Sequence, residues 1–420
     1  MPASAQSDSP REVRFLDDVK VLEISNMAPN QLAMHLADLG ADVIKIETPK
    51  RGDATRLIGK LPEFNDSMLH RRWNRGKRSV ALDTNTPDGL ALLRQLIRDV
   101  DILVEGLRPG TLQKMGLAWS DLTALNPDLV MVSLSGYGQD GPYRNMGSHG
   151  IGFDAIAGLV PVEEDERGHP RVVTRHVNTG TLLAPLFGAT AALAALAWSR
   201  RTGEPVYLDV AQADAAAFAN IGIEGGVARE RAVAAGTVAA PPEAPAADGA
   251  PAPRPTMQCY RTRDDKMLLM MALERKFFAR LVDAVGRPDL LHHFPEDQYL
   301  IQGNAEVDDA LVEIIGTRDL AEWMELFAEV DVPVVPLNDT DEAAADPQLA
   351  YRLQWLPADQ GTVTLGTPVQ ATPRVAPPRQ AAAIGQDTVE VLSSIGVEQS
   401  EIDRLEREGV IRITRVAGDG

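Results

Sequence analysis

The chain has 420 residues, of which 44% are hydrophobic and 24% charged, values typical of a folded protein with a packed core. Its length exceeds the size at which a single core stops growing, so we expect two domains. The formal net charge of −19 argues against nucleic acid as a partner, because affinity for a duplex comes mainly from a basic surface.

Short apolar runs alternate with helical patterns through the first half of the chain. Strands are predicted at 19–24 and 43–47, with a helix at 31–39 between them, which together form a βαβ unit. The same alternation continues with a helix at 89–99 and with strands at 79–82, 102–105 and 129–134. This order predicts an α/β fold with a parallel, helix-flanked sheet. No G-x-G-x-x-G follows the first strand, so the fold is Rossmann-like without the dinucleotide fingerprint.

Three features bear on the compartment. The first 19 residues are polar and charged, so we expect a frayed tail and not a secretory signal. The apolar stretch 181–198 contains Pro185 and Gly188 and barely reaches the length of a membrane span, so we interpret it as a buried core helix. The only cysteine, Cys259, excludes an intrachain disulfide. Together these features favour a cytoplasmic protein with no membrane partner.

The second half begins with a change of composition. Residues 226–255 are rich in Ala, Pro and Gly and are predicted to form a linker or a surface loop. Strands at 257–261 and 267–272 and helices at 275–285 and 320–330 predict a smaller α+β domain at 256–346. The last segment, 347–420, passes through a Pro-rich stretch and ends in helices at 388–395 and 399–408.

A local excess of positive charge lies between Lys45 and Arg78. This segment holds ten basic and four acidic residues, and its densest part, 71–78, reads R-R-W-N-R-G-K-R before a predicted strand. We expect these cations to be presented by a loop, where they can converge on phosphate groups of a small polyanion. The alternative is a solvated basic face that balances acidic surface elsewhere.

Several motifs resemble those of the family III CoA-transferases, the group that includes formyl-CoA transferase, carnitine CoA-transferase and 2-methylacyl-CoA racemase. Their order and spacing cover nearly the whole chain. The matching segments are L-A-D-L-G-A-D-V-I-K-I-E at 36–47, G-K-R-S at 76–79, V-E-G-L-R-P-G at 104–110, S-G-Y-G-Q-D-G-P-Y at 135–143 and V-P-V-V-P-L-N-D at 332–339.

The resemblance implies a large Rossmann-like domain built from residues 1–225 and the returning segment 347–420, with the small domain inserted between them. It also implies that subunits are open rings interlocked as a homodimer. Substrates would be an acyl-CoA and a carboxylic acid acceptor, with no metal required. The phosphates of CoA suit the basic segment, and charge-assisted contacts to them are each worth roughly 1.5 to 3 kcal/mol. The implied CoA-binding residues are Lys77, Arg108, Lys114 and Met115, with Arg75 and Arg78 as weaker candidates.

The resemblance also locates the reactive residue. Family transferases use an aspartate as nucleophile, ten residues before a helix glycine, and that spacing from Gly188 leads to Asn178. An amide has no anionic oxygen with which to form the covalent intermediate. Three explanations stay open: the nucleophile lies elsewhere, with Asp154 the nearest carboxylate in sequence; Asn178 is an engineered substitution; or the chain does not transfer CoA.

A second chemistry is implied by the racemase branch of the family. His149 falls where that branch has a proton-transferring histidine, and Glu274 falls where it has a glutamate that orients this histidine. Such a pair can move a proton near neutral pH. Gly150 stands where the racemase has an aspartate, and the opposing base aligns near Asn178. Nearby glycines at 136, 138 and 141 are candidates for a loop that closes over the thioester, or for an ordinary turn.

Three hypotheses follow from the sequence. The preferred one is an enzyme that transfers CoA between carboxylic acids. The second is an isomerase acting at the α-carbon of an acyl-CoA through His149 and Glu274. The third is a CoA-thioester binding protein that kept the fold and lost the chemistry.

Overall fold

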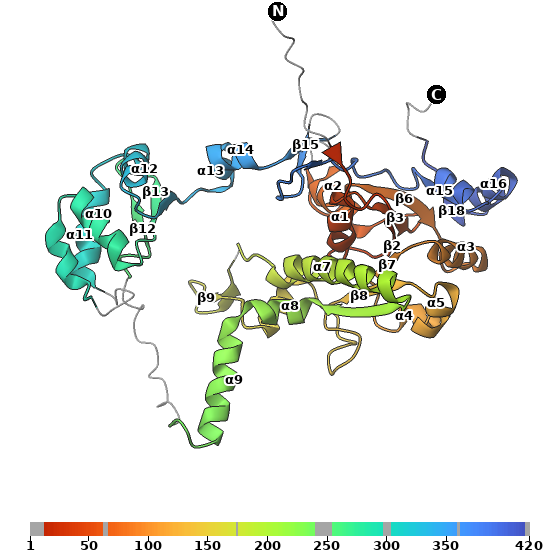
Figure 1. Cartoon of the computed structure of the whole chain (residues 1–420), viewed down its shortest axis with the longest axis horizontal. Helices are drawn as coiled ribbons and strands as arrows, with labels where there is room; N and C mark the ends of the chain where they lie inside the picture. Colours follow the sequence, from red (N-terminus) through yellow and green to blue (C-terminus); the bar gives the residue numbers. More distant parts are fainter. Residues whose placement is uncertain are drawn as a thin grey trace, which may run out of the picture. The chain divides into compact units, whose positions relative to one another are not determined.

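The computed structural model describes residues 12–61, 66–173, 175–239, 254–296, 304–358 and 362–415. The chain divides into two compact units, Met1–Val238 with Leu353–Gly420, and Ala239–Arg352. Each unit is described by itself below, with element labels as in Figure 1.

A mainly parallel sheet forms the centre of the first unit. Its spatial order is β11-β8-β7-β2-β3-β6-β18, and all neighbouring pairs are parallel except β18 with β6. The predicted parallel sheet is therefore confirmed. The strands are β2 (Lys20–Ile24), β3 (Asp42–Glu47), β6 (Lys77–Leu82), β7 (Ile102–Glu105), β8 (Val130–Ser135), β11 (Val206–Ala211) and β18 (Ile411–Arg412).

Helices cover both faces of this sheet, which explains why its inner strands are apolar on both sides. On one face the strands pack against α1 (Asn30–Asp38) and α7 (Thr179–Thr202), through residues such as Leu32, Leu36 and Ala192. On the other face they pack against α3 (Pro87–Arg98), α5 (Trp119–Leu125), α15 (Thr388–Ser394) and α16 (Gln399–Arg407). The helices predicted at 31–39, 89–99, 388–395 and 399–408 are confirmed to within two residues at each end.

The long helix α7 is the predicted core helix. It is apolar and long enough to cross a membrane by length and composition. In this fold it packs beside α1, β8 and β11 (Figure 1), and it buries Ala184, Gly188 and Ala192. Its first turn lies so close to α8 (Gln212–Ala219) that a Cβ on Gly180 would stand 2.3 Å from the carbonyl oxygen of Gln212. Glycine at 180 therefore sets the approach of the two helices.

The second unit has its own core. An antiparallel sheet of β12 (Gln258–Arg261), β13 (Met267–Met270) and β14 (Val334–Pro336) packs with α10 (Arg275–Ala284), α11 (Ala305–Ile315) and α12 (Leu320–Glu329). Phe278, Trp323 and Phe327 are fully buried there. The strands and helices predicted in this region are present, whereas α11 and β14 were not predicted.

Shorter elements complete the described chain. The short strand pairs are β1 (Glu12–Val13) with β17 (Arg374–Val375), β4 (Lys60–Leu61) with β5 (Asp66–Ser67), β9 (Val162–Glu164) with β10 (Pro170–Val172), and β15 (Trp355–Pro357) with β16 (Val363–Leu365). The remaining helices are η1 (Ala54–Leu57), α2 (Met68–Asn74), α4 (Thr111–Lys114), α6 (Gly150–Ile156), α9 (Ile221–Ala234), η2 (Pro288–His293), α13 (Thr340–Ala345) and α14 (Pro347–Arg352).

Two sequence-based predictions are corrected here. The basic segment 71–78 is not a loop, because Arg71 and Arg72 lie in α2 and Lys77 and Arg78 begin β6. The side chain of Ser67 caps α2 by accepting a hydrogen bond from the His70 amide, which stabilises this short helix. The predicted linker 226–255 begins inside α9, whose Ala-rich sequence favours a helix, and its residues 240–253 lie outside the described residues.

The close approach of α7 and α8 predicts that Gly180→Ala destabilises the protein. The added methyl group meets backbone atoms, so we expect the free energy of unfolding to fall by roughly 1 to 3 kcal/mol, as for an overpacked core. The matched control is Gly225→Ala in α9, where a Cβ would have no atom within 4 Å, and which should gain up to about 1 kcal/mol from helix propensity. Denaturant unfolding followed by circular dichroism measures both. Unchanged stability of Gly180→Ala would contradict this account of the packing.

Candidate functional site

A cavity of about 740 Å³ opens at the carboxyl edge of the parallel strands in the first unit. The chain runs from β2 to β3 and β6 on one side, and β7, β8 and β11 lie on the other side of β2. Ligands of open α/β sheets bind at such a reversal of strand order. The loops that follow β2 and β7, at 26–29 and 106–109, both line the cavity.

The cavity is positively charged. Arg108, Lys114 and Arg144 line it, all three with exposed side chains, and none of the described residues that line it is an aspartate or glutamate. In a chain with a net charge of −19, three cations without a carboxylate make a local site for an anion. Arg144 was not singled out from the sequence. Arg144 lies in the long loop after β8, and nothing in the sequence indicated that this loop would bring it to the same cavity as Arg108.

The cavity also holds the candidate reactive residues. His149 and Asn178 both line it, so the structure brings together two residues that are 29 positions apart. Asn178 directly precedes α7, and His149 directly precedes α6. A Cβ on Gly150 would stand 2.8 Å from the Asn178 amide nitrogen, so a larger residue at 150 would displace the Asn178 side chain. Of the candidate loop glycines at 136, 138 and 141, Gly136 lines the cavity.

Asp154 is a structural anchor for this end of the cavity. Its side chain is fully buried, and its carboxylate accepts hydrogen bonds from the backbone amides of Thr179 and Gly180, at 2.7 and 2.8 Å. The same carboxylate pairs with Nε2 of His176 at 2.7 Å. The carboxylate therefore holds the first turn of α7, and with it Asn178, in place. His176 was not predicted from the sequence, although its position two residues before Asn178 was a signal.

Lys77 lies in a buried network of charges. Its ammonium contacts Glu23 Oε2 at 2.6 Å, the Asn30 carbonyl at 2.7 Å and Asn74 Oδ1 at 3.1 Å, which accounts for its three protons. Burial lowers the pKa of Lys77 to about 8, so it remains mostly protonated at neutral pH. The side chain is 2% exposed. A contact between Lys77 and CoA stays a prediction, and its described partners are internal.

The other predicted CoA contacts differ in their surroundings. Arg75 is buried and forms a bidentate pair with Asp38, at 2.7 and 2.5 Å. Arg78 pairs with Asp42 and with Glu390. Met115 is half-buried and packs against the core cluster beside α3 and α5. Among the predicted contacts, Arg108 and Lys114 are the two that line the cavity.

Glu274 belongs to the second unit. It precedes α10 and pairs with Lys276 at 2.9 Å. His149 belongs to the first unit. The pairing of Glu274 with His149 therefore stays a prediction.

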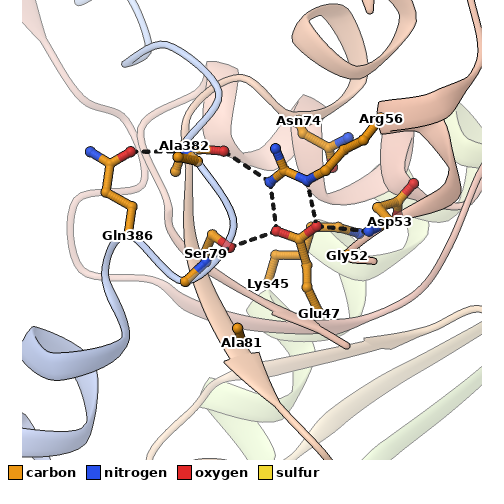
Figure 2. A network of polar contacts seen from close by, with 12 residues as sticks. Lys45, Glu47, Gly52, Asp53, Arg56, Asn74, Ser79, Ala81, Ala382 and Gln386 are labelled. Atoms are coloured by element: carbon orange, nitrogen blue, oxygen red, sulfur yellow. Dashed lines mark hydrogen bonds and ion pairs between the residues drawn. The ribbon is translucent and has the colours of Figure 1, made fainter. Parts of the chain in front are cut away.

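Glu47 holds the loop after β3 beside this network. Its two carboxylate oxygens accept from Nε and Nη2 of Arg56 at 2.9 and 2.7 Å, and Ser79 donates to it at 2.5 Å (Figure 2). Burial alone would raise the pKa of Glu47, but the hydrogen bond and charge of Arg56 outweigh it and lower the pKa to about 2. The ionised form of Glu47 is thus strongly favoured in the folded protein.

Comparisons with known proteins are consistent with this geometry. The sequence profile of CoA-transferase family III matches residues 16–388. The chain is 32% identical over 355 residues to succinyl-CoA--D-citramalate CoA-transferase of Chloroflexus aurantiacus, covering 82% of this chain and 83% of that protein. It is 26% identical over 400 residues to human succinyl-CoA:glutarate CoA-transferase, covering 93% of this chain and 88% of that one.

Solved structures share the fold. Rv3272 from Mycobacterium tuberculosis superimposes with a TM-score of 0.72 at 25% identity, over 90% of this chain and 99% of that one. A CAIB/BAIF family protein from Brucella suis gives a TM-score of 0.71 at 24% identity, over 92% of this chain and 100% of the other.

The pKa of Glu47 predicts a stability change in acid. The usual value is 4.5 and the folded value about 2, so the stabilisation is present above pH 4.5 and is lost as the pH falls towards 2. We expect Glu47→Gln to be about 3 kcal/mol less stable than the wild type at pH 6, with the difference shrinking steadily below pH 4.5. Guanidinium unfolding across this pH range measures it.

The control for this prediction is Glu390→Gln. Glu390 pairs with Arg78 but its side chain is 71% exposed, so its removal should change stability by less than about 1 kcal/mol at any pH. A Glu47→Gln difference that stays constant from pH 6 to pH 2.5 would contradict the role assigned to the Arg56 pair.

Proposed function

Because the chain belongs to CoA-transferase family III, and is therefore an enzyme that transfers CoA between carboxylic acids, we propose that it binds acyl-CoA in the cavity at the carboxyl edge of the sheet. Arg108, Lys114 and Arg144 contact the phosphates of CoA, since they are the cations of the described cavity lining and no described residue of that lining carries a carboxylate. The thioester lies at the end formed by His149 and Asn178.

The proposed substrates are dicarboxylic acids. The relatives from Chloroflexus aurantiacus and human are named for succinyl-CoA as donor and for citramalate or glutarate as acceptor. A dicarboxylic donor or acceptor keeps a second, free carboxylate. This charge suits a cavity lined by Arg108, Lys114 and Arg144, with no carboxylate among its described lining residues. As the family resemblance implies, we propose an interlocked homodimer, and the single Cys259 supports a cytoplasmic location.

We propose that transfer proceeds without a covalent bond to the protein. The observation that carries this proposal is that Asn178 occupies the cavity where a nucleophilic carboxylate is expected. The only nearby carboxylate that the sequence offered, Asp154, is buried and already accepts three hydrogen bonds. Attack by Asp154 would break the contacts that hold α7, and an amide cannot attack.

The reaction can instead run between the two substrates. The acceptor carboxylate attacks the thioester carbonyl, a C–O bond forms, the C–S bond breaks and CoA leaves as the thiolate. The product of this step is a mixed anhydride of the two acids. The thiolate then attacks the acceptor carbonyl of the anhydride, which forms the new thioester and releases the donor acid as its carboxylate. The Asn178 amide donates a hydrogen bond to the oxyanion of each addition step, and Asp154 with His176 positions it.

Removing a cation from the cavity lining is predicted to weaken CoA binding. Arg108→Gln and Lys114→Gln should each raise the Kd for CoA by about tenfold, or ~1.4 kcal/mol, because each loses a charge-assisted hydrogen bond. Isothermal titration calorimetry measures the change. Arg201→Gln, at the exposed end of α7, is the matched control and should leave the Kd unchanged. Unaltered CoA affinity in both cavity variants would place CoA elsewhere.

The fate of oxygen tests the proposed mechanism. In a single turnover with succinyl-CoA and glutarate labelled with ¹⁸O in both carboxylates, the direct route transfers one ¹⁸O from glutarate to the released succinate. A covalent route through an enzyme carboxylate leaves that succinate unlabelled and puts ¹⁸O into the protein. Mass spectrometry of the succinate and of protein peptides separates the two. Label in a protein carboxylate would overturn the direct route and identify the nucleophile.

A further inference from the structure

A second, smaller cavity of about 210 Å³ lies within the first unit. It shares no residue with the larger cavity. Helix α2 contributes to both, because Trp73 lines the larger cavity and His70 and Arg71 line the smaller one. The remaining lining comes from Arg56, Arg75 and the returning C-terminal segment, at 356–358, 364 and 378–383.

The lining of this cavity is strongly basic. Four arginines line it, Arg56, Arg71, Arg75 and Arg379, and none of the described residues that line it carries a carboxylate. Acidic partners lie behind the lining, in the pairs Arg56 with Glu47, Arg75 with Asp38, and Arg379 with Asp387.

The guanidinium groups of Arg56 and Arg379 have N–H donors that these ion pairs do not use. Arg56 uses Nε and Nη2 for Glu47, and Nη2 also donates to the carbonyl of Ala382 (Figure 2). Arg379 uses Nη1 for Asp387. In the described part of the chain, Nη1 of Arg56 and both Nε and Nη2 of Arg379 donate to no protein group. The spare donors come from two segments more than 300 residues apart in sequence.

His70 adds a buried donor. Lys77 donates to Asn74 Oδ1, which fixes the amide so that Asn74 Nδ2 faces Nδ1 of His70 at 3.0 Å. The Thr55 hydroxyl lies 2.9 Å from the same Nδ1 and donates either to it or to Asp53 Oδ1, at 2.6 Å. Since the Asn74 amide nitrogen can only donate, we assign Nδ1 as the acceptor, which places the ring proton on Nε2. Burial lowers the pKa of His70 to about 3, so the ring is neutral. The residue is 3% exposed, and Nε2 has no partner among the described residues. A buried N–H without an acceptor is unfavourable, so an acceptor is expected there.

We propose that this cavity binds a small, doubly charged oxyanion, a phosphate group. A tetrahedral phosphate offers acceptors on several sides, which matches donors that converge from Arg56, Arg379 and His70. A dicarboxylate of the proposed substrates is longer and flatter and suits the extended cavity better. The site is independent of CoA binding and does not rest on the proposed function.

The bound phosphate holds the returning segment against α2. Arg56 and His70 belong to the N-terminal part of the unit, whereas Arg379 belongs to the returning part. One anion that accepts from all three links the two parts, in addition to the direct bond from Arg56 to Ala382. Phosphate should therefore raise the thermal stability of the first unit.

The test uses the full chain, prepared without phosphate or sulfate, with inorganic phosphate as the probe. Phosphate should raise the midpoint of thermal unfolding above that found in sodium chloride of the same ionic strength, and calorimetry should show one site per chain. Arg379→Gln should raise the Kd for phosphate at least tenfold. Arg374→Gln, an exposed arginine of the same segment, is the matched control and should bind phosphate as the wild type does.

Two further arms separate the sources of phosphate. With CoA at saturation, phosphate should still raise the midpoint of thermal unfolding. In Arg379→Gln the affinities for CoA and for dephospho-CoA should both stay close to those of the wild type. His70→Phe, which keeps the ring shape and removes the donor, should also weaken phosphate binding. The proposal is overturned if phosphate stabilises the protein no more than sodium chloride does. It is also overturned if Arg379→Gln binds phosphate as the wild type does, or if bound CoA abolishes the stabilisation by phosphate.

Discussion

The architecture of the site depends on a cluster of largely buried charges that contacts Asn30, the first residue of α1. Glu23, Glu47 and Asp53 supply three carboxylates, and Lys45, Lys77 and Arg56 supply three cations, so the cluster is neutral. Breaking one such buried pair costs about 3 to 5 kcal/mol, because the remaining charge stays buried and unpaired. Lys45 also donates to the Ser25 carbonyl and to the side chain of Asn30. The cavity loop at 26–29 lies between these two anchors, so the buried charges fix the wall of the proposed CoA site.

The basic residues therefore have two separate tasks. Those that are buried, such as Lys77 and Arg75, neutralise carboxylates inside the fold. Those that are exposed in the cavity, Arg108, Lys114 and Arg144, have no described carboxylate beside them in its lining and are available to a ligand. This division allows a chain with a net charge of −19 to bind a polyanion. It also explains why counting charges along the sequence can predict an anionic ligand but cannot separate the cations that are buried in ion pairs from those that line the cavity.

Most of the fold could be predicted from the sequence because its signals are local. Continuous apolar runs gave β2, β3, β7 and β8, and helical periodicity gave α3 and α16. Helix α2 was missed because it has only seven residues and is rich in arginine. The burial of Lys77 could not be predicted, since its partner Glu23 lies 54 residues earlier. That His149 and Asn178 share one site was expected because both align with reactive positions of the family. The Asp154–His176 pair was not predicted, because it depends on how the chain turns into α7.

The central claim is that acyl-CoA lies in the cavity at the strand-order reversal, with its reactive end at Asn178. A crystal structure with succinyl-CoA bound tests it most directly. We expect phosphate groups within hydrogen-bond distance of Arg108, Lys114 or Arg144, and the thioester carbonyl beside the Asn178 amide. A complex in which CoA follows the Arg56 and Arg379 cavity instead, or in which the thioester lies away from α7, would contradict the claim.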